Sequence, residues 1–122
     1  MSRILLVEDE AMLREAFTIA LMAEKFNVDT AANGQEALDK VQRSAPPYDL
    51  ILLDLMMPVL DGVGFLKSAN LPKTAPGTKV FVLSNLSSGE EISEVMELGI
   101  HGYKLKASLT PNDVITLVRD NL

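Results

Sequence analysis

Three short runs of this chain are apolar at every position. They are Ile4–Val7, Leu50–Leu53 and Val80–Leu83. Strands at the centre of a parallel sheet are covered on both faces and have this continuous apolar pattern, whereas half-exposed strands alternate. We therefore predict that the three runs are central parallel strands. Asn27–Ala32 and Gly102–Lys106 mix apolar and polar residues, and we predict that they form edge strands.

Helical patterns alternate with these strands. Apolar residues recur at spacings of three and four in most of these segments, as on one face of a helix. The predicted helices are Glu10–Glu24, Gly34–Ser44, Gly62–Ala69, Gly89–Leu98 and a fifth that begins at Thr110. The fifth has a capping threonine, Pro111 at the first helical position and Asp113 three residues after the cap. Two prolines and a glycine interrupt Leu71–Thr78, which we interpret as a connection.

Five alternations of strand and helix predict a doubly wound α/β domain with a five-stranded parallel sheet and five helices. With the three apolar strands in the centre, the flavodoxin-like strand order 2-1-3-4-5 fits best. In that order the winding reverses between the first and third strands. Ligands are therefore expected outside the carboxyl ends of those two strands.

Composition narrows the class of protein. The 122 residues, 48% of them hydrophobic, suffice for one core, so we expect a single domain over 1–122. The chain has no cysteine and only one histidine, His101, which excludes disulfides and thiolate or His-rich zinc sites. A net charge of −6 and a pI near 4.7 disfavour direct binding to nucleic acid or anionic membrane. No apolar run is long enough to span a membrane and no signal peptide is recognisable, so cytoplasmic residence is the default expectation.

Ionisable and hydroxyl side chains follow the predicted strands where each one ends. They are Glu8, Asp9 and Glu10 after the first strand, Asp54 after the third, Ser84 at the end of the fourth and Lys106 at the end of the fifth. Crowded carboxylates repel one another and favour a bound cation. Oxygen ligands without nitrogen or sulfur suit Mg²⁺ rather than Zn²⁺. Glu8, Asp9, Asp54 and Lys106 together carry −2, so one Mg²⁺ makes the site nearly neutral and able to accept a phosphoryl group.

A carboxylate can attack phosphorus when cations neutralise the phosphoryl oxygens, and the product is an aspartyl phosphate. The Ser84 hydroxyl would donate a hydrogen bond to that phosphate. Lys106 would place a positive charge beside it. Taken singly, each residue has an ordinary explanation as a helix cap, a solvated turn or a surface charge. Their joint placement at the ends of four strands of one sheet favours the functional interpretation.

The whole chain resembles the receiver domain of two-component response regulators. Four segments carry the resemblance, together with the Asn33-Gly34 entry into the second helix: Ile4–Glu10, Asp54-Leu55-Met56-Met57-Pro58 with Asp61-Gly62, Val82-Leu83-Ser84, and Gly99–Lys106. The resemblance implies a switch that takes a phosphoryl group from a histidine kinase or phosphotransfer protein. It implies a downstream protein bound through the fourth helix, fifth strand and fifth helix. Such a domain catalyses only its own Mg²⁺-dependent phosphorylation and dephosphorylation.

The resemblance also assigns roles to residues. Asp54 is the phosphoacceptor, and Asp9 and Asp54 ligate Mg²⁺ together with the backbone carbonyl of Met56, while Glu8 acts mostly through bound water. Ser84 and Lys106 hold the phosphoryl group. Ser84 and Tyr103 are the switch residues that respond to it. Lys106 is preferred over Lys104 because it lies three residues after Tyr103.

The sequence departs from the family pattern beside two of these residues. Ala107 follows Lys106 where the family usually has proline, often after a cis bond; before alanine a cis bond would cost about 2.5–4 kcal/mol. Asn85 follows Ser84 where the family usually has alanine or glycine. Met56 and Leu86, at the positions that could orient a hydrolytic water, are apolar, and we expect slow dephosphorylation.

Two alternatives stay open at this point. A haloacid dehalogenase-like phosphatase also uses an aspartate nucleophile, Mg²⁺, a hydroxyl residue and a lysine. Such enzymes have a second aspartate two positions after the nucleophile, where this chain has Met56. The other alternative is a receiver that only docks and is never phosphorylated, against which the complete set of acidic, hydroxyl and lysine residues argues. The hypothesis of flavin or dinucleotide binding has less support, because no glycine-rich turn follows the first strand.

Overall fold

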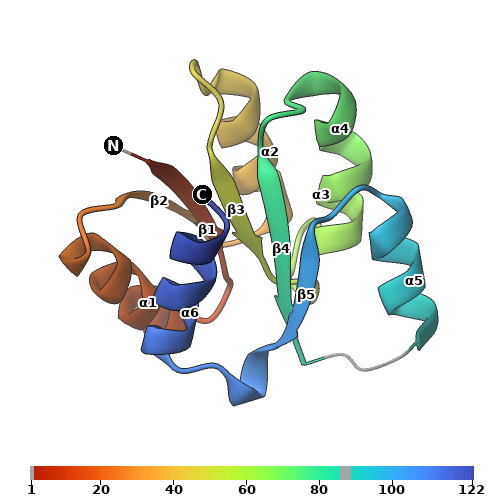
Figure 1. The fold of residues 1–122 in the computed structure, drawn as a ribbon. Coiled ribbons are helices and arrows are strands. Elements are labelled where there is room, and N and C mark those ends of the chain that lie inside the picture. Colours follow the sequence, from red (N-terminus) through yellow and green to blue (C-terminus); the bar gives the residue numbers. More distant parts are fainter. Residues whose placement is uncertain (1, 86–88) are drawn as a thin grey trace.

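The computed structural model describes residues 2–85 and 89–122. Within these residues the chain forms a parallel sheet in the order β2-β1-β3-β4-β5 (Figure 1). The strands are β1 (Arg3–Val7), β2 (Asn27–Ala31), β3 (Leu50–Leu53), β4 (Lys79–Ser84) and β5 (Gly102–Leu105). The flavodoxin-like order predicted from the sequence is confirmed.

Helices cover both faces of the sheet. They are α1 (Ala11–Ala23), α2 (Gly34–Arg43), α3 (Gly62–Ala69), α4 (Leu71–Thr74), α5 (Gly89–Glu97) and α6 (Pro111–Asp120), with a 3-10 turn η1 (Lys106–Ser108) after β5. Figure 1 shows α1 and α6 side by side on one face, and α2, α3 and α5 on the other.

Each face of the sheet has its own apolar core. Leu5, Val7, Ile51 and Leu53 belong to the core under α2, α3 and α5, which also contains Phe65. The alternate strand residues, including Ile4, Leu6, Leu50 and Leu52, face the core under α1 and α6. Because side chains alternate along a strand, a strand that serves both cores is apolar throughout. This is the physical reason for the three continuous apolar runs.

All five predicted helices are present, and where their ends differ from the prediction the shift is one residue. The segment Leu71–Thr78, interpreted as a connection, instead contains the one-turn helix α4. Pro72 falls in the first turn of α4, where a missing N–H costs no helical hydrogen bond. The fifth strand ends at Leu105, one residue earlier than predicted, so Lys106 opens the turn η1.

Local capping fixes where the helices begin. The side chain of Asn33 accepts a hydrogen bond from the Glu36 N–H at 2.8 Å at the start of α2. At the start of α6, Thr110 and Asp113 form a reciprocal capping box. Among the described residues, no helix has the length and apolar content to cross a bilayer.

Candidate functional site

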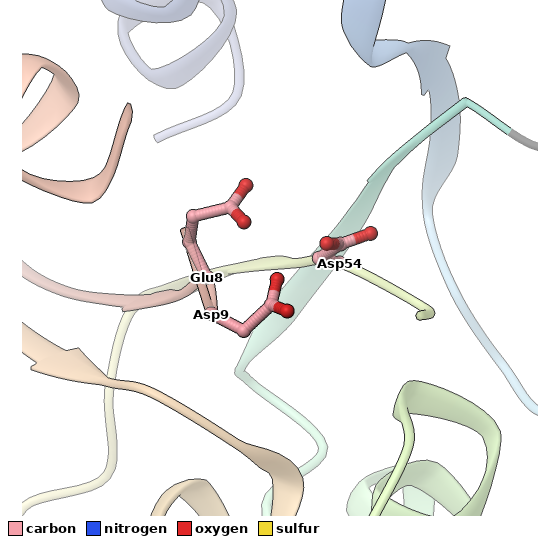
Figure 2. Close-up of side chains that lie close together, drawn as sticks. All are labelled: Glu8, Asp9 and Asp54. Carbon is pink, nitrogen blue, oxygen red and sulfur yellow. The ribbon is translucent and has the colours of Figure 1, made fainter. Parts of the chain in front are cut away.

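Backbone hydrogen bonds that continue past the strand ends position the two buried carboxylates. The Glu8 N–H donates to the Ala31 carbonyl at 3.0 Å, and the Asp54 N–H donates to the Val7 carbonyl at 3.0 Å. Each bond extends a parallel ladder by one residue, so both side chains leave the same edge of the sheet. Residues 46 positions apart in sequence therefore meet at the carboxyl ends of β1 and β3 (Figure 2).

Three carboxylates gather at this edge. One carboxylate oxygen from each of Glu8, Asp9 and Asp54 lies within 4.8 Å of the other two, a grouping that could hold a metal ion. Glu8 and Asp54 are buried, with 2% and 4% of their surfaces exposed, whereas Asp9 is exposed. The site therefore has a buried anionic floor and an open side at Asp9.

Lys106 reaches into this group from η1. Its Nζ lies 3.0 Å from Glu8 Oε1 and 3.1 Å from Asp54 Oδ2, and only 11% of the lysine side chain is exposed. Burial alone would lower the pKa of Lys106, but the hydrogen bonds to Glu8 and Asp54 outweigh it and raise the pKa. The ammonium is therefore a permanent cation between the two buried carboxylates.

Glu8 is held from several directions. Burial raises the pKa of Glu8, and the hydrogen bonds from the Glu10 N–H and from Lys106 only partly oppose this effect. The Glu10 N–H donates to Glu8 Oε2 at 3.1 Å, and Arg14 donates to the Glu8 backbone carbonyl at 2.8 Å. Sequence reasoning did not find Arg14, because a long side chain that folds back on the preceding loop leaves no periodic signal.

Ser84 and Tyr103 lie on the neighbouring strands. Leu53 pairs with Val82, so Ser84, at the end of β4, lies one residue beyond the level of Asp54. Ser84 is buried, and the partly exposed Tyr103 packs against the core under α5. Tyr103 also pairs with Val82, two residues before Ser84. The two predicted switch residues are thus on adjacent strands near the same edge.

The loop after Asp54 forms one wall of the site. Met56 is 63% exposed, and its N–H donates to Asp54 Oδ1 at 3.4 Å. A surface cleft of about 720 Å³ opens beside this loop, and Asp9, Met56 and Glu94 are among its lining residues. The cleft gives an approaching group access to the carboxylates from the side of Asp9.

The residues next to Ser84 and Lys106 contact each other. The side-chain oxygen of Asn85 accepts a hydrogen bond from the Ala107 N–H at 2.7 Å. In the described part of the chain the cis peptide bond is Ala45–Pro46, and the Lys106–Ala107 bond is trans. The sequence analysis singled out Asn85 and Ala107 as departures from the family pattern, but it did not predict the hydrogen bond between them. Leu86, the other residue expected to govern dephosphorylation, lies outside the described residues.

Comparison with known proteins assigns the chain to a family. The profile of the response regulator receiver domain matches residues 4–119. The chain belongs to this family, whose members are signalling switches. This assignment supports the receiver interpretation rather than that of a haloacid dehalogenase-like phosphatase.

Individual relatives agree with this assignment. A CpxR homolog of Haemophilus influenzae, described as a transcriptional regulatory protein, is 41% identical over 80% of this chain and 40% of its own length. The transcriptional regulatory protein ResD of Bacillus subtilis is 35% identical over 97% of this chain and 47% of its own. The chain thus spans less than half the length of these curated relatives.

Solved structures share the fold. The chemotaxis protein CheY4 of Vibrio cholerae superimposes with a TM-score of 0.88 at 29% identity, over 100% of this chain and 99% of that one. CheY of Borrelia burgdorferi, solved in a complex with CheX, BeF3 and Mg, gives a TM-score of 0.84 at 28% identity over 98% of this chain and 87% of that one.

Proposed function

We propose that this chain is a Mg²⁺-dependent signalling switch that accepts a phosphoryl group on Asp54 from a histidine kinase or a phosphotransfer protein. The observation that carries the proposal is the grouping of carboxylate oxygens from Glu8, Asp9 and Asp54 within 4.8 Å, with the Lys106 ammonium 3.1 Å from Asp54. Membership of the receiver family supports the same conclusion.

The donor set fits Mg²⁺, because its side-chain ligands are carboxylate oxygens on an open edge of the sheet. Asp9, Asp54 and the Met56 carbonyl would hold the ion, with Glu8 acting through bound water. When bound, Mg²⁺ supplies positive charge that offsets repulsion between the carboxylates and the phosphoryl oxygens. The Borrelia CheY structure contains Mg and BeF3, which supports a similar site in this chain.

In the proposed reaction an Asp54 carboxylate oxygen attacks the phosphorus of the donor. A P–O bond to Asp54 forms while the bond from phosphorus to the donor's nitrogen or oxygen breaks, and the leaving group keeps the electron pair. Lys106, already paired with Asp54, then also donates to an oxygen of the transferred group. The Ser84 hydroxyl donates to another of these oxygens.

The phosphorylated state is expected to change the face made by α5, β5 and α6, which is the face predicted from the sequence to contact a downstream protein. A new dianion at Asp54 would draw the Ser84 hydroxyl inward and leave room for the Tyr103 ring. The position of Tyr103 on β5, partly exposed and packed against the core, supports this coupling. Cytoplasmic residence stays a prediction.

Intact-mass measurement after incubation with acetyl phosphate and Mg²⁺ tests the proposal. The wild-type chain should gain one phosphate, and Asp54→Asn should gain none. Asp9→Asn should label poorly at any Mg²⁺ concentration, whereas Asp120→Asn, at the exposed end of α6, should behave like wild type. Absence of label on the wild-type chain would instead support a receiver that only docks, and normal labelling of Asp9→Asn without metal would contradict the Mg²⁺ site.

A further inference from the structure

One hydrogen bond links the loop after β4 to the turn after β5. Asn85 Oδ1 accepts from the Ala107 N–H at 2.7 Å, across 22 residues of sequence. Asn85 directly follows Ser84, and Ala107 directly follows Lys106. The bond therefore joins the immediate neighbours of the two residues that we assign to the phosphoryl group.

This bond continues the pairing of β4 with β5 beyond the end of the sheet. Ser84 pairs with Leu105 in the last step of the parallel ladder, and the Asn85–Ala107 bond follows it. The first N–H groups of a helical turn have no partner within the turn. Asn85 supplies an acceptor to one of them and thus caps η1 from a different loop.

Other bonds close η1 internally. The Leu109 N–H donates to the Lys106 carbonyl at 3.1 Å, and the Ser108 hydroxyl donates to the Leu105 carbonyl at 2.9 Å. These bonds shape the turn, but they do not fix its position relative to β4. The Asn85 bond ties η1 to the end of β4 one step beyond the Ser84–Leu105 pairing, and η1 carries the backbone of Lys106.

The position of this backbone decides what the Lys106 ammonium can reach. A lysine side chain is flexible, and holding it in one conformation costs conformational entropy. The reach of its ammonium from that conformation depends on where the Lys106 backbone lies. The ammonium makes contacts of 3.0 and 3.1 Å with Glu8 and Asp54 while it is largely buried. A modest shift of η1 would lengthen both contacts.

We propose that Asn85 is a positioning residue, which holds the Lys106 turn against the end of β4 and thereby aims the Lys106 ammonium at the phosphoryl group on Asp54. The inference rests on the proposed function. Asn85 is exposed and acts through Lys106 rather than on the phosphoryl group itself. Ala107 has the N–H that this bond requires, whereas a proline there would lack it.

A different role for Asn85 makes the opposite prediction. If its side chain only obstructs access to Asp54, Asn85→Ala should label faster and bind beryllofluoride more tightly than wild type. If it positions Lys106, Asn85→Ala should do both less well. Asn85→Leu keeps much of the bulk but removes the acceptor, so it should match Asn85→Ala under positioning and wild type under obstruction.

Beryllofluoride affinity in the presence of Mg²⁺, followed by ¹⁹F NMR, tests the positioning role. Asn85→Ala and Asn85→Leu should each weaken it about fivefold, which corresponds to a hydrogen bond of about 1 kcal/mol. The unfolding midpoint should fall only slightly, because one hydrogen bond is lost. The affinity for Mg²⁺ alone should not fall, because the carboxylates are untouched and a displaced ammonium would repel the ion less. Asn112→Ala, at an exposed asparagine on α6, is the control and should resemble wild type.

The decisive comparison is made without Lys106. In a Lys106→Ala background, adding Asn85→Ala should cause no further loss, because both substitutions remove the same interaction. A semisynthetic chain with an ester in place of the Ala107 amide lacks the donor and should bind beryllofluoride at least as weakly as Asn85→Ala, since the ester also weakens the Lys106 carbonyl that accepts from Leu109.

Unchanged or tighter binding by Asn85→Ala, or losses that add to those of Lys106→Ala, would overturn the inference while leaving the proposed function intact. A wild-type chain that neither binds beryllofluoride nor labels with acetyl phosphate would overturn the proposed function, and this inference with it.

Discussion

Gly62 lies against the backbone of the proposed phosphoacceptor. A Cβ at this position would be 2.6 Å from the Asp54 carbonyl oxygen and 2.8 Å from the Leu55 Cα. Backbone atoms cannot rotate away, so Gly62→Ala must displace the loop that carries Asp54. We expect a loss of roughly 1–3 kcal/mol in the free energy of unfolding and slower labelling by acetyl phosphate.

Gly77→Ala is the matched control, because its added Cβ would have nothing within 4 Å. Chemical denaturation and labelling rates of the two variants should separate clearly. Equal behaviour of Gly62→Ala and Gly77→Ala would show that the close approach at Asp54 is easily relieved.

The exposed Met56 side chain is expected to lengthen the phosphorylated state. Hydrolysis needs a water in line with phosphorus, and a thioether cannot hold that water by strong hydrogen bonds. Met56→Asn should shorten the half-life of labelled protein several-fold, as followed by loss of phosphate from the intact mass. Met12→Asn, on the exposed face of α1, should leave the decay unchanged. An unaltered decay in Met56→Asn would remove position 56 from the control of lifetime.

At the scale of elements, the start of α6 depends on a titratable group. The Asp113 carboxylate accepts from the Thr110 N–H at 2.8 Å, and this hydrogen bond lowers the pKa of Asp113 below its ordinary 3.8. Because the ionised form is favoured in the folded state, its stabilisation is present above 3.8 and is lost as the pH falls through the folded-state pKa. Asp113→Asn should therefore melt below wild type at neutral pH, and the difference should shrink below pH 3.8.

Asn33→Ala provides the comparison for this pH dependence. It removes an amide oxygen that caps α2 and does not titrate, and it should cost about 1 kcal/mol at neutral pH and below pH 3.8 alike. Thermal unfolding followed by circular dichroism measures both variants. A difference between wild type and Asp113→Asn that does not depend on pH would contradict the assigned role of the carboxylate.

The elements were predictable where burial or capping acts locally. Continuous apolar runs identified the three central strands because both faces of the sheet are covered. Thr110, Pro111 and Asp113, which are typical of a helix N-terminus, marked the start of α6. The helix α4 was missed because Pro72 usually marks a break, and only the structure shows that it falls in a first turn. The positive φ of 69° at Val59 has no sequence signal either, since β-branched residues rarely adopt it.

The site was predictable as a set of residues and not as a set of contacts. The topology brings the strand ends together, so residues that follow β1, β3, β4 and β5 had to share one edge. The direct pairing of Lys106 with both Glu8 and Asp54, and the Asn85–Ala107 bond, depend on loop conformation. Loop conformation is set by tertiary packing, which no periodic pattern records.

At the scale of the whole molecule, the proposed function predicts that a charge added at Asp54 alters the face made by α5, β5 and α6. Beryllofluoride with Mg²⁺ should shift the NMR resonances of β5 and α5 as well as those of the Asp54 loop, with Tyr103 becoming more protected from solvent. Tyr103→Ala should keep the shifts near Asp54 and reduce those on α5. Shifts confined to the Asp54 loop would mean that the phosphorylated state is not transmitted through β5.

The central claim is that Asp54 itself carries the phosphoryl group. Borohydride reduction of the chain labelled with acetyl phosphate and Mg²⁺, followed by peptide sequencing in a mass spectrometer, locates an acyl phosphate because reduction converts the modified aspartate to homoserine. We predict homoserine at position 54 and unmodified Glu8 and Asp9. Reduction products at Glu8 or Asp9, or none at position 54 in a chain that has gained phosphate, would contradict the account.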